Sequence, residues 1–284
     1  MTQKKYYPAA LTIAGSDSGG GAGIQADLRT FSAFGVYGCS AITAITAQNP
    51  HQVSRVDALE PEAVAAQIST VNAAINIDAV KIGMLANLDI VKAVDKELKQ
   101  NFCNKKPIVI DPVMISTSKV QLLSDDCIDY FQKEFLFNAD WLTPNIFEAE
   151  RLTNSEIKSV ADMVEVAKFC ADKWQCSCII KGGHSTIGDD EMVYDIICHN
   201  NKILRLGSPF IADSQATHGT GCTFSSAIAA GFALELPWKK VLKAAKDFVF
   251  GSIADAVPIG EDTEAMYPPQ DSFSEEISLK AMKN

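Results

Sequence analysis

One stretch near the start of the chain decides the fold: Ala9-Ala10-Leu11-Thr12-Ile13-Ala14-Gly15-Ser16-Asp17-Ser18-Gly19-Gly20-Gly21-Ala22-Gly23. Its first six residues are apolar except for one threonine, which is typical of a buried strand. Five of the next nine residues are glycine, which predicts a loop. After this loop, Ile24, Leu28 and Phe31 recur at the spacing of one helix face. A strand, a glycine-rich loop and a helix in this order predict the first unit of an α/β protein.

The same alternation of strand and helix continues along the chain. Short apolar runs typical of strands lie at residues 40–47, 79–82, 107–110, 140–143 and 178–181. Segments with helical spacing lie between these runs, at residues 61–75, 90–98, 125–135 and 160–174. A hairpin is expected over residues 193–206, and the last two helices begin near Cys222 and Trp238. Such alternation predicts a mostly parallel sheet with helices on both faces.

The chain shows no internal boundary between domains. No linker rich in proline, glycine or serine divides it, so we predict one domain over residues 1–284. The end of the chain differs, because three prolines follow Val257. Residues 258–284 are therefore expected to be a loosely ordered tail.

The composition excludes several function classes. Of the 284 residues, 47% are hydrophobic and 21% are charged, a balance that disordered chains lack. The formal net charge of −10 argues against nucleic acid or an anionic membrane surface as the main partner, because such binding needs a basic patch. No apolar run approaches the length of about 18 residues that predicts a membrane span. The eight scattered cysteines, without a secretory signal, predict reduced thiols in a cytoplasmic protein.

The predicted topology also places the ligand. In an open parallel sheet, ligands bind outside the carboxyl ends of the strands. This rule selects the segments that follow the strands: residues 15–23, 48–49, 83–84, 111–112, 144–145, 181–184 and 219–222. The glycines of residues 15–23 have neither the dinucleotide nor the Walker A spacing. They indicate close approach of the backbone to some other ligand, or simply a tight turn.

A second glycine loop comes directly before a helix rich in alanine and serine. It consists of Gly219, Thr220, Gly221 and Cys222. Backbone amides at a helix N-terminus attract anions, so this loop is predicted to stabilise a phosphoryl group during its transfer. Cys222 is expected to act either as a thiolate base, because the helix N-terminus favours the thiolate form, or as a positioned dipole. The alternative is a helix-start loop with a packed cysteine.

Oxygen-bearing side chains follow two other strands. Asp111 ends one strand, and Asn145 and Glu148 follow the next at helical spacing. Such oxygens suit Mg²⁺, which is often shared with nucleotide phosphates. The alternative is a helix cap at Asn145 and a first-turn charge at Glu148. Lys181 ends a further strand, where it meets a phosphate or is simply solvated.

Taken together and in this order, the motifs resemble the hydroxymethylpyrimidine and phosphomethylpyrimidine kinases of thiamine biosynthesis, within the ribokinase-like superfamily. The segments that carry the resemblance are residues 10–17, 20–28, 46–49, 81–85, 111–114, 143–145, 181–184 and 218–223. The resemblance implies a three-layer α/β/α sandwich, with ATP and Mg²⁺ as cofactors. It also implies phosphorylation of 4-amino-5-hydroxymethyl-2-methylpyrimidine and then of its monophosphate, and it suggests a homodimer.

The resemblance further implies roles for individual residues. The pyrimidine pocket would be formed by Gly15, Ala22, Asp27, Gln48, Met84 and Val113. Asn145 and Glu148 match an Asn-x-x-Glu element that acts on Mg²⁺ and phosphates, and Cys222 stands where the superfamily usually has an aspartate base. The nearest alternative is a pyridoxal or pyridoxine kinase, which a methionine in place of Gln48 would have favoured. A catalytically silent nucleotide-binding protein is a further alternative, against which the intact polar residues argue.

Overall fold

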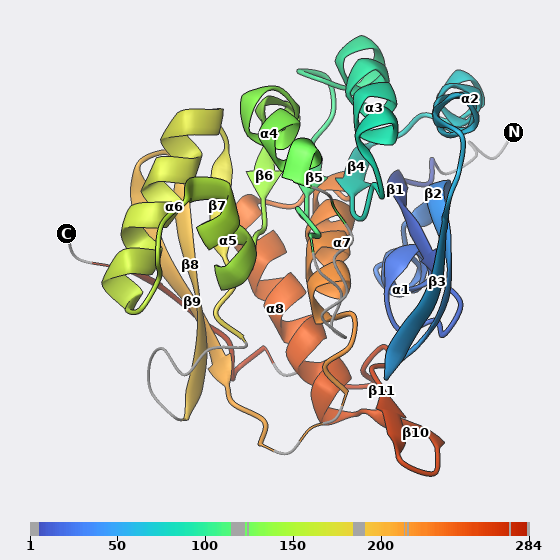
Figure 1. The fold of residues 1–284 in the computed structure, drawn as a ribbon. Coiled ribbons are helices and arrows are strands. Elements are labelled where there is room, and N and C mark those ends of the chain that lie inside the picture. The colour runs from blue at the N-terminus through green and yellow to red at the C-terminus, as the bar shows by residue number, and fades with distance from the viewer. Residues whose placement is uncertain are drawn as a thin grey trace, which may run out of the picture.

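The computed structural model describes residues 6–114, 123, 125–183, 191–212, 214, 216–272 and 274–282. His184, at the end of the predicted segment 181–184, lies outside these residues. Within the described part of the chain, ten strands form one sheet in the order β12-β9-β8-β7-β6-β5-β4-β1-β2-β3 (Figure 1). The sheet strands are β1 (Ala9–Asp17), β2 (Tyr37–Asn49), β3 (Gln52–Ala58), β4 (Ala79–Ile82), β5 (Ile108–Ile110), β6 (Trp141–Leu142), β7 (Ser177–Ile180), β8 (Met192–His199), β9 (Lys202–Pro209) and β12 (Ser278–Ala281).

The centre of the sheet is parallel and its margins are antiparallel. The parallel strands run from β2 through β1, β4, β5 and β6 to β7. β3 pairs antiparallel with β2 at one margin, and β8, β9 and β12 continue antiparallel from β7 at the other. The predicted mostly parallel α/β sheet is therefore confirmed. β3 was not predicted, because its residues are largely exposed and carry no apolar run.

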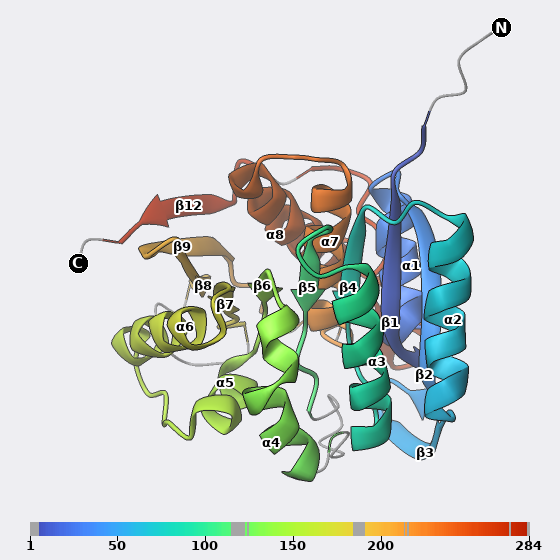
Figure 2. The ribbon, with the colours of Figure 1, turned by 90° about the horizontal axis from the view of Figure 1, so that it is seen from above.

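Helices cover both faces of the sheet, which gives the expected three layers (Figure 2). Seen from above, α1, α7 and α8 lie on one face, and α2, α3, α4 and α6 lie on the other. The helices are α1 (Gly23–Ala33), α2 (Pro61–Ala74), α3 (Leu88–Asn101), α4 (Asp125–Lys133), α5 (Ile146–Thr153), α6 (Val160–Trp174), α7 (Thr220–Ala233) and α8 (Trp238–Ala254), with a short 3-10 helix over Phe135–Asn138.

Local signals explain where several elements begin and end. The predicted strand at residues 79–82 and the helix at 160–174 have the observed bounds. The Ser159 side chain caps the latter helix, and Gln175 ends it in the left-handed region. β1 is longer than predicted and includes Gly15, with an irregular pairing to β2 between Ala14 and Ser16. Gly15 therefore belongs to the strand and not to the loop.

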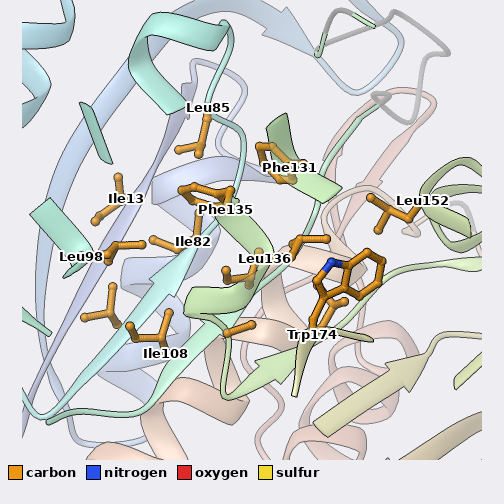
Figure 3. Close-up of a cluster of buried hydrophobic side chains, with 14 of the residues drawn as sticks. Ile13, Ile82, Leu85, Leu98, Ile108, Phe131, Phe135, Leu136, Leu152 and Trp174 are labelled. Atoms are coloured by element: carbon orange, nitrogen blue, oxygen red, sulfur yellow. The ribbon is translucent and has the colours of Figure 1, made fainter. Parts of the chain in front are cut away.

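Two apolar cores hold the layers together. Figure 3 shows part of the larger one, where Ile82 and Ile108 from the sheet meet Leu98, Phe135 and Trp174 from the helical layer. All of these side chains are almost completely buried. The second core joins α1, α7 and α8 to the opposite face of the sheet. Burial on both faces explains why the central strands read as continuous apolar runs in the sequence.

The end of the chain is more regular than the sequence predicted. Residues 257–265 form the hairpin of β10 (Val257–Gly260) and β11 (Thr263–Ala265). Further on, β12 pairs with β9 and extends the main sheet. Ile277, directly before β12, is only 3% exposed and belongs to the second core. The expectation of a loose tail missed these strands because β12 contributes only a short apolar signal.

Truncation after Ser272 should therefore destabilise the protein. Removing β12 exposes the edge of β9 and deletes Ile277, whose burial alone contributes about 1.5–3 kcal/mol. We expect the melting temperature to fall by at least about 4 °C in a thermal unfolding experiment. Ile259→Ala, in a side chain that is 56% exposed, is the control and should melt within about 1 °C of the parent protein. Equal melting temperatures for the truncated and parent chains would contradict this role of β12.

Candidate active site

A cavity of about 780 Å³ opens at the carboxyl ends of the parallel strands. It is lined by every residue predicted for the site except Asp27, namely Gly15, Ala22, Gln48, Met84, Asp111, Val113, Asn145, Glu148, Lys181, Gly219, Thr220, Gly221 and Cys222. These residues come from segments spread over most of the chain. The strand-end rule brings them together, because parallel strands present their carboxyl ends at one edge of the sheet.

The N-terminus of α7 faces this cavity. Gly219 precedes the helix with φ +84°, in the left-handed region. A side chain there would collide with the carbonyl of Gly21, so the two glycine loops are in direct contact. Gly221 and Cys222 lie in the first turn, where helix amides generally have no partner within the helix. They are placed to hold an anion in the cavity.

A cation and two carboxylates lie beside this helix N-terminus. Lys181 Nζ is 2.6 Å from Asp111 Oδ1 and 4.0 Å from Glu148 Oε2. Burial raises the pKa of Glu148 to about 7; Lys181 opposes this shift and Asp111 adds to it. Gly221 leaves space here, because an added Cβ would lie 3.1 Å from Lys181 Nζ and 3.4 Å from Asp111 Oδ2. The group combines two carboxylates with one ammonium group.

The capping alternative for Asn145 and Glu148 is also present. Asn145 Oδ1 accepts a hydrogen bond from the Glu148 amide at 2.8 Å, and Glu148 Oε2 accepts one from the Asn145 amide at 2.7 Å. This capping box starts α5 and fixes both side chains at the cavity wall. Within the described residues, no group of three or more His, Cys, Asp or Glu side chains could hold a metal ion by itself. The metal role of Asp111 and Glu148 stays a prediction.

Asp27 does not line the cavity, although it was predicted to contact the substrate. Its carboxylate is fully buried and 2.8 Å from Lys81 Nζ, which is also fully buried. Thr12 and Ser226 each donate a hydrogen bond of 2.6 Å to the same carboxylate. Lys81 does line the cavity and was missed. The available signal was a lone lysine inside the apolar strand β4, since buried lysines need a charged partner.

The expected thiolate form of Cys222 was wrong. Burial raises the pKa of this thiol to about 11, although the Lys81 charge and the Gly23 amide lower it. Asp27 and Asp111 add to the increase. Cys222 therefore keeps its proton at neutral pH, because desolvation outweighs the helix N-terminus.

Gln48 lies in a polar group that the sequence did not reveal. Its amide nitrogen is 3.3 Å from His218 Nε2, and Thr46 Oγ1 donates to its amide oxygen at 3.2 Å. His218 Nε2 is also 2.9 Å from Asp17 Oδ2. Burial tends to raise the pKa of Asp17, but hydrogen bonds from His218 and from two loop amides hold it below its ordinary value. Asp17 thus fixes both the first glycine loop and His218.

A further part of the cavity wall lies at β8, β9, α7 and α8. It combines the ion pair of Lys246 and Asp195 with apolar side chains, which include Val193, Pro209, Phe224, Val249, Phe250 and Ile253. β8 and β2 stand on opposite sides of β5 in the strand order, so the β8 part of this wall lies across the sheet from the strand that carries Gln48. The sequence did not predict this wall, because apolar residues in helices and strands are usually core residues.

The ribokinase-like fold, with a cavity at the carboxyl ends of its strands and at the N-terminus of α7, is typical of a kinase. The sequence model of the phosphomethylpyrimidine kinase family matches residues 17–267, and the chain belongs to this family. It is 40% identical over 255 residues to the hydroxymethylpyrimidine/phosphomethylpyrimidine kinase of Haemophilus influenzae, covering 88% of this chain and 93% of that relative. The corresponding kinase of Synechococcus elongatus is 42% identical over 254 residues, covering 89% and 94%.

Solved structures give the same fold. The phosphomethylpyrimidine kinase of Clostridium difficile is 39% identical, with a TM-score of 0.73 over 85% of this chain and 97% of that one. The pyridoxal kinase of Staphylococcus aureus in complex with AMP-PCP and pyridoxal is 30% identical, with a TM-score of 0.85 over 98% of this chain and all of that one. In the described part of this chain, no helix has the length and apolar character to span a membrane.

Gly221→Ala should impair catalysis without unfolding the protein. The new Cβ would press on Lys181 and Asp111 at the helix N-terminus. We expect kcat to fall by about 10²-fold in a steady-state kinase assay, the loss typical of one disturbed transition-state donor. Gly260→Ala, outside the cavity, is the matched control, because its Cβ would meet only Thr263 at ordinary distances of 3.4 and 3.5 Å. Normal turnover in a folded Gly221→Ala variant would show that close packing at this glycine does not matter for catalysis.

Proposed function

We propose that the protein transfers the γ-phosphoryl group of ATP to the hydroxymethyl oxygen of 4-amino-5-hydroxymethyl-2-methylpyrimidine, and then phosphorylates the monophosphate to the diphosphate. One observation carries the proposal: a single cavity joins the polar group around Gln48 to the Lys181 group across the N-terminus of α7. The names of the relatives support this choice of substrate. The homologous kinase fold with bound AMP-PCP supports ATP as the donor.

The geometry of the cavity suggests a role for each of these residues in the reaction. The pyrimidine would lie between Gly15, Gln48 and Met84, with its hydroxymethyl group toward Cys222. The phosphates would lie toward Lys181, and the amides of Gly221 and Cys222 would stabilise the charge on the transferring group. The hydroxymethyl oxygen forms the new bond to phosphorus, the bond to ADP breaks and the hydroxyl proton is released. Because Cys222 is protonated at neutral pH, we assign it a positioning role, which phosphoryl transfer needs more than a strong base.

Mg²⁺ is part of the same proposal. Asp111 and Glu148 supply carboxylate oxygens near the predicted phosphate position, and the raised pKa of Glu148 reflects a buried charge that a cation would stabilise. Mg²⁺ usually takes one or two carboxylates and shares the remaining positions with phosphate and water. When bound, it would neutralise phosphate charge. Lys181 would balance the second carboxylate.

Glu148→Gln should specifically weaken the binding of Mg²⁺. Glutamine can keep the capping box, so α5 should still form. We expect the Mg²⁺ concentration for half-maximal rate to rise about tenfold or more, measured by titration at fixed total ATP. Glu165→Gln, in the exposed side chain of α6 that pairs with Lys168, is the control and should leave the titration unchanged. An unchanged titration in Glu148→Gln would remove Glu148 from the metal site.

Pyridoxal is the alternative substrate, since the S. aureus pyridoxal kinase shares this fold over the whole chain. Gln48 favours the aminopyrimidine, because its amide offers one donor and one acceptor side by side. The ring nitrogen and exocyclic amine of the pyrimidine present the complementary pair. Pyridoxal lacks this amine and would leave part of the amide unpaired, at a cost of about 1–3 kcal/mol.

Assays of the pyrimidine alcohol, its monophosphate and pyridoxal at matched ATP test the proposal directly. The parent protein should prefer the first two over pyridoxal. Gln48→Met should lower kcat/KM for the pyrimidine alcohol at least about tenfold while leaving the KM of ATP nearly unchanged. Gln52→Met, in the exposed start of β3, should behave as the parent. The same ratio of pyrimidine to pyridoxal use in Gln48→Met and parent would show that Gln48 does not select the substrate.

We also propose a cytoplasmic location and a homodimer. All eight cysteines are free thiols, which supports a reducing compartment. The homodimer rests on the family resemblance.

A further inference from the structure

The proposed reaction assigns no role to the ion pair at the far wall of the cavity. Lys246 Nζ on α8 lies 2.8 Å from Asp195 Oδ2 on β8. The two residues are only 7% and 3% exposed, yet both line the cavity. A buried ion pair is weak evidence for stability, because the desolvation of two charges offsets much of their attraction. Its position in the cavity wall therefore calls for a different explanation.

The second oxygen of this carboxylate holds the backbone. Asp195 Oδ1 accepts a hydrogen bond of 3.0 Å from the amide of Gly182. Gly182 is packed so closely on β8 that a side chain would collide with the carbonyl oxygen of Tyr194. Hydrogen bond and close packing together fix Gly182 against β8.

Gly182 directly follows the lysine that faces the proposed phosphate position. The Lys181 amide donates to the carbonyl of Pro144 at 2.9 Å, and Lys181 Nζ reaches Asp111 at 2.6 Å. The backbone of Lys181 is thus anchored from two sides, by Pro144 and, through Gly182, by Asp195. Lys246 holds the Asp195 carboxylate in place by charge. These contacts form a continuous path from α8 to the Lys181 ammonium.

We propose that Asp195 is a positioning residue for phosphoryl transfer, which fixes Gly182 so that Lys181 Nζ meets the nucleotide phosphates beside Asp111. Lys246 orients the Asp195 carboxylate. The inference rests on the proposed role of Lys181 in binding phosphate. The ion pair of Lys246 and Asp195 would then serve to hold Lys181 in position. Small displacements of a catalytic group can lower the reaction rate by a large factor.

The test compares two buried aspartates that differ in position. Asp195→Ala should raise the KM of ATP and lower kcat, each about tenfold, while the KM of the pyrimidine alcohol stays within twofold of the parent value. Asp195→Asn should recover most of this loss, because its amide oxygen can still accept from Gly182. Asp95→Ala is the matched control: Asp95 is 4% exposed and pairs with Lys99 at 2.8 Å, but it lies outside the cavity. It should lower the melting temperature and leave both KM values unchanged.

A purely structural role would give different results. Equal kinetic effects of Asp195→Ala and Asp95→Ala would overturn the proposal, and so would an Asp195→Asn variant as impaired as Asp195→Ala. If Asp195→Ala does not fold, Asp195→Leu/Lys246→Met takes its place, because apolar replacement of a whole buried pair is often tolerated. This double variant also removes the acceptor of the Gly182 amide. It should show the same rise in the KM of ATP, and an unchanged value would refute the inference.

A double-mutant cycle with Lys181→Met identifies the path of the effect. If Asp195 acts through Lys181, Asp195→Ala should change the KM of ATP by less than twofold in the Lys181→Met background. If Asp195→Ala instead raises the KM of ATP by the same factor in the Lys181→Met background as in the parent, the proposal is overturned in favour of direct contact between Asp195 and the nucleotide. An unaltered KM and kcat in Lys181→Met alone would reject the role of Lys181 and this inference with it. Phosphorylation of the pyrimidine by the parent protein tests the proposed function separately.

Discussion

The site depends on the anchoring of the α7 N-terminus to two buried carboxylates. Ser226 donates to Asp27 at 2.6 Å, and Ser225 lies 3.4 Å from Asp111. Each carboxylate also forms an ion pair with a lysine. The pair of Asp27 and Lys81 lies by β1 and β4, and the pair of Asp111 and Lys181 lies at the ends of β5 and β7. Cys222 is one helical turn before Ser226 and shares its face of the helix. The amides proposed to hold the phosphoryl group are therefore fixed by bonds within the protein before any ligand arrives.

The two ends of the cavity are formed by different parts of the chain. The strands near its Gln48 end, β1 and β2, come from the start of the chain, and those at its Asp195 end come from beyond residue 190. The α7 N-terminus lies between the two ends, where both proposed substrates must meet. An acidic protein with a net charge of −10 can still bind anionic ligands here, because the attraction comes from local amides and lysines and not from the overall charge.

The sequence was sufficient to predict the parallel sheet and the part of the cavity lining that follows the parallel strands, because glycines, prolines and single polar residues mark the ends of apolar strands. It could not predict partners that are distant in the chain. The family resemblance implied that Asp27 contacts the substrate, but its partner Lys81 lies 54 positions later inside a strand. The ion pair of Asp195 and Lys246 was not predicted for the same reason, because the two residues are far apart in the sequence. The state of Cys222 depended on burial, a tertiary property that a helix N-terminus alone does not reveal.

The central claim is that the amides at the start of α7 hold the phosphoryl group between the pyrimidine and the nucleotide. A crystal structure of the protein with the pyrimidine alcohol, Mg²⁺ and a non-hydrolysable ATP analogue tests it most directly. The account predicts γ-phosphate oxygens within about 2.7–3.2 Å of the Gly221 and Cys222 amides, with the hydroxymethyl oxygen on the Gln48 side. A γ-phosphate bound away from these amides, in a complex with both ligands in place, would contradict it.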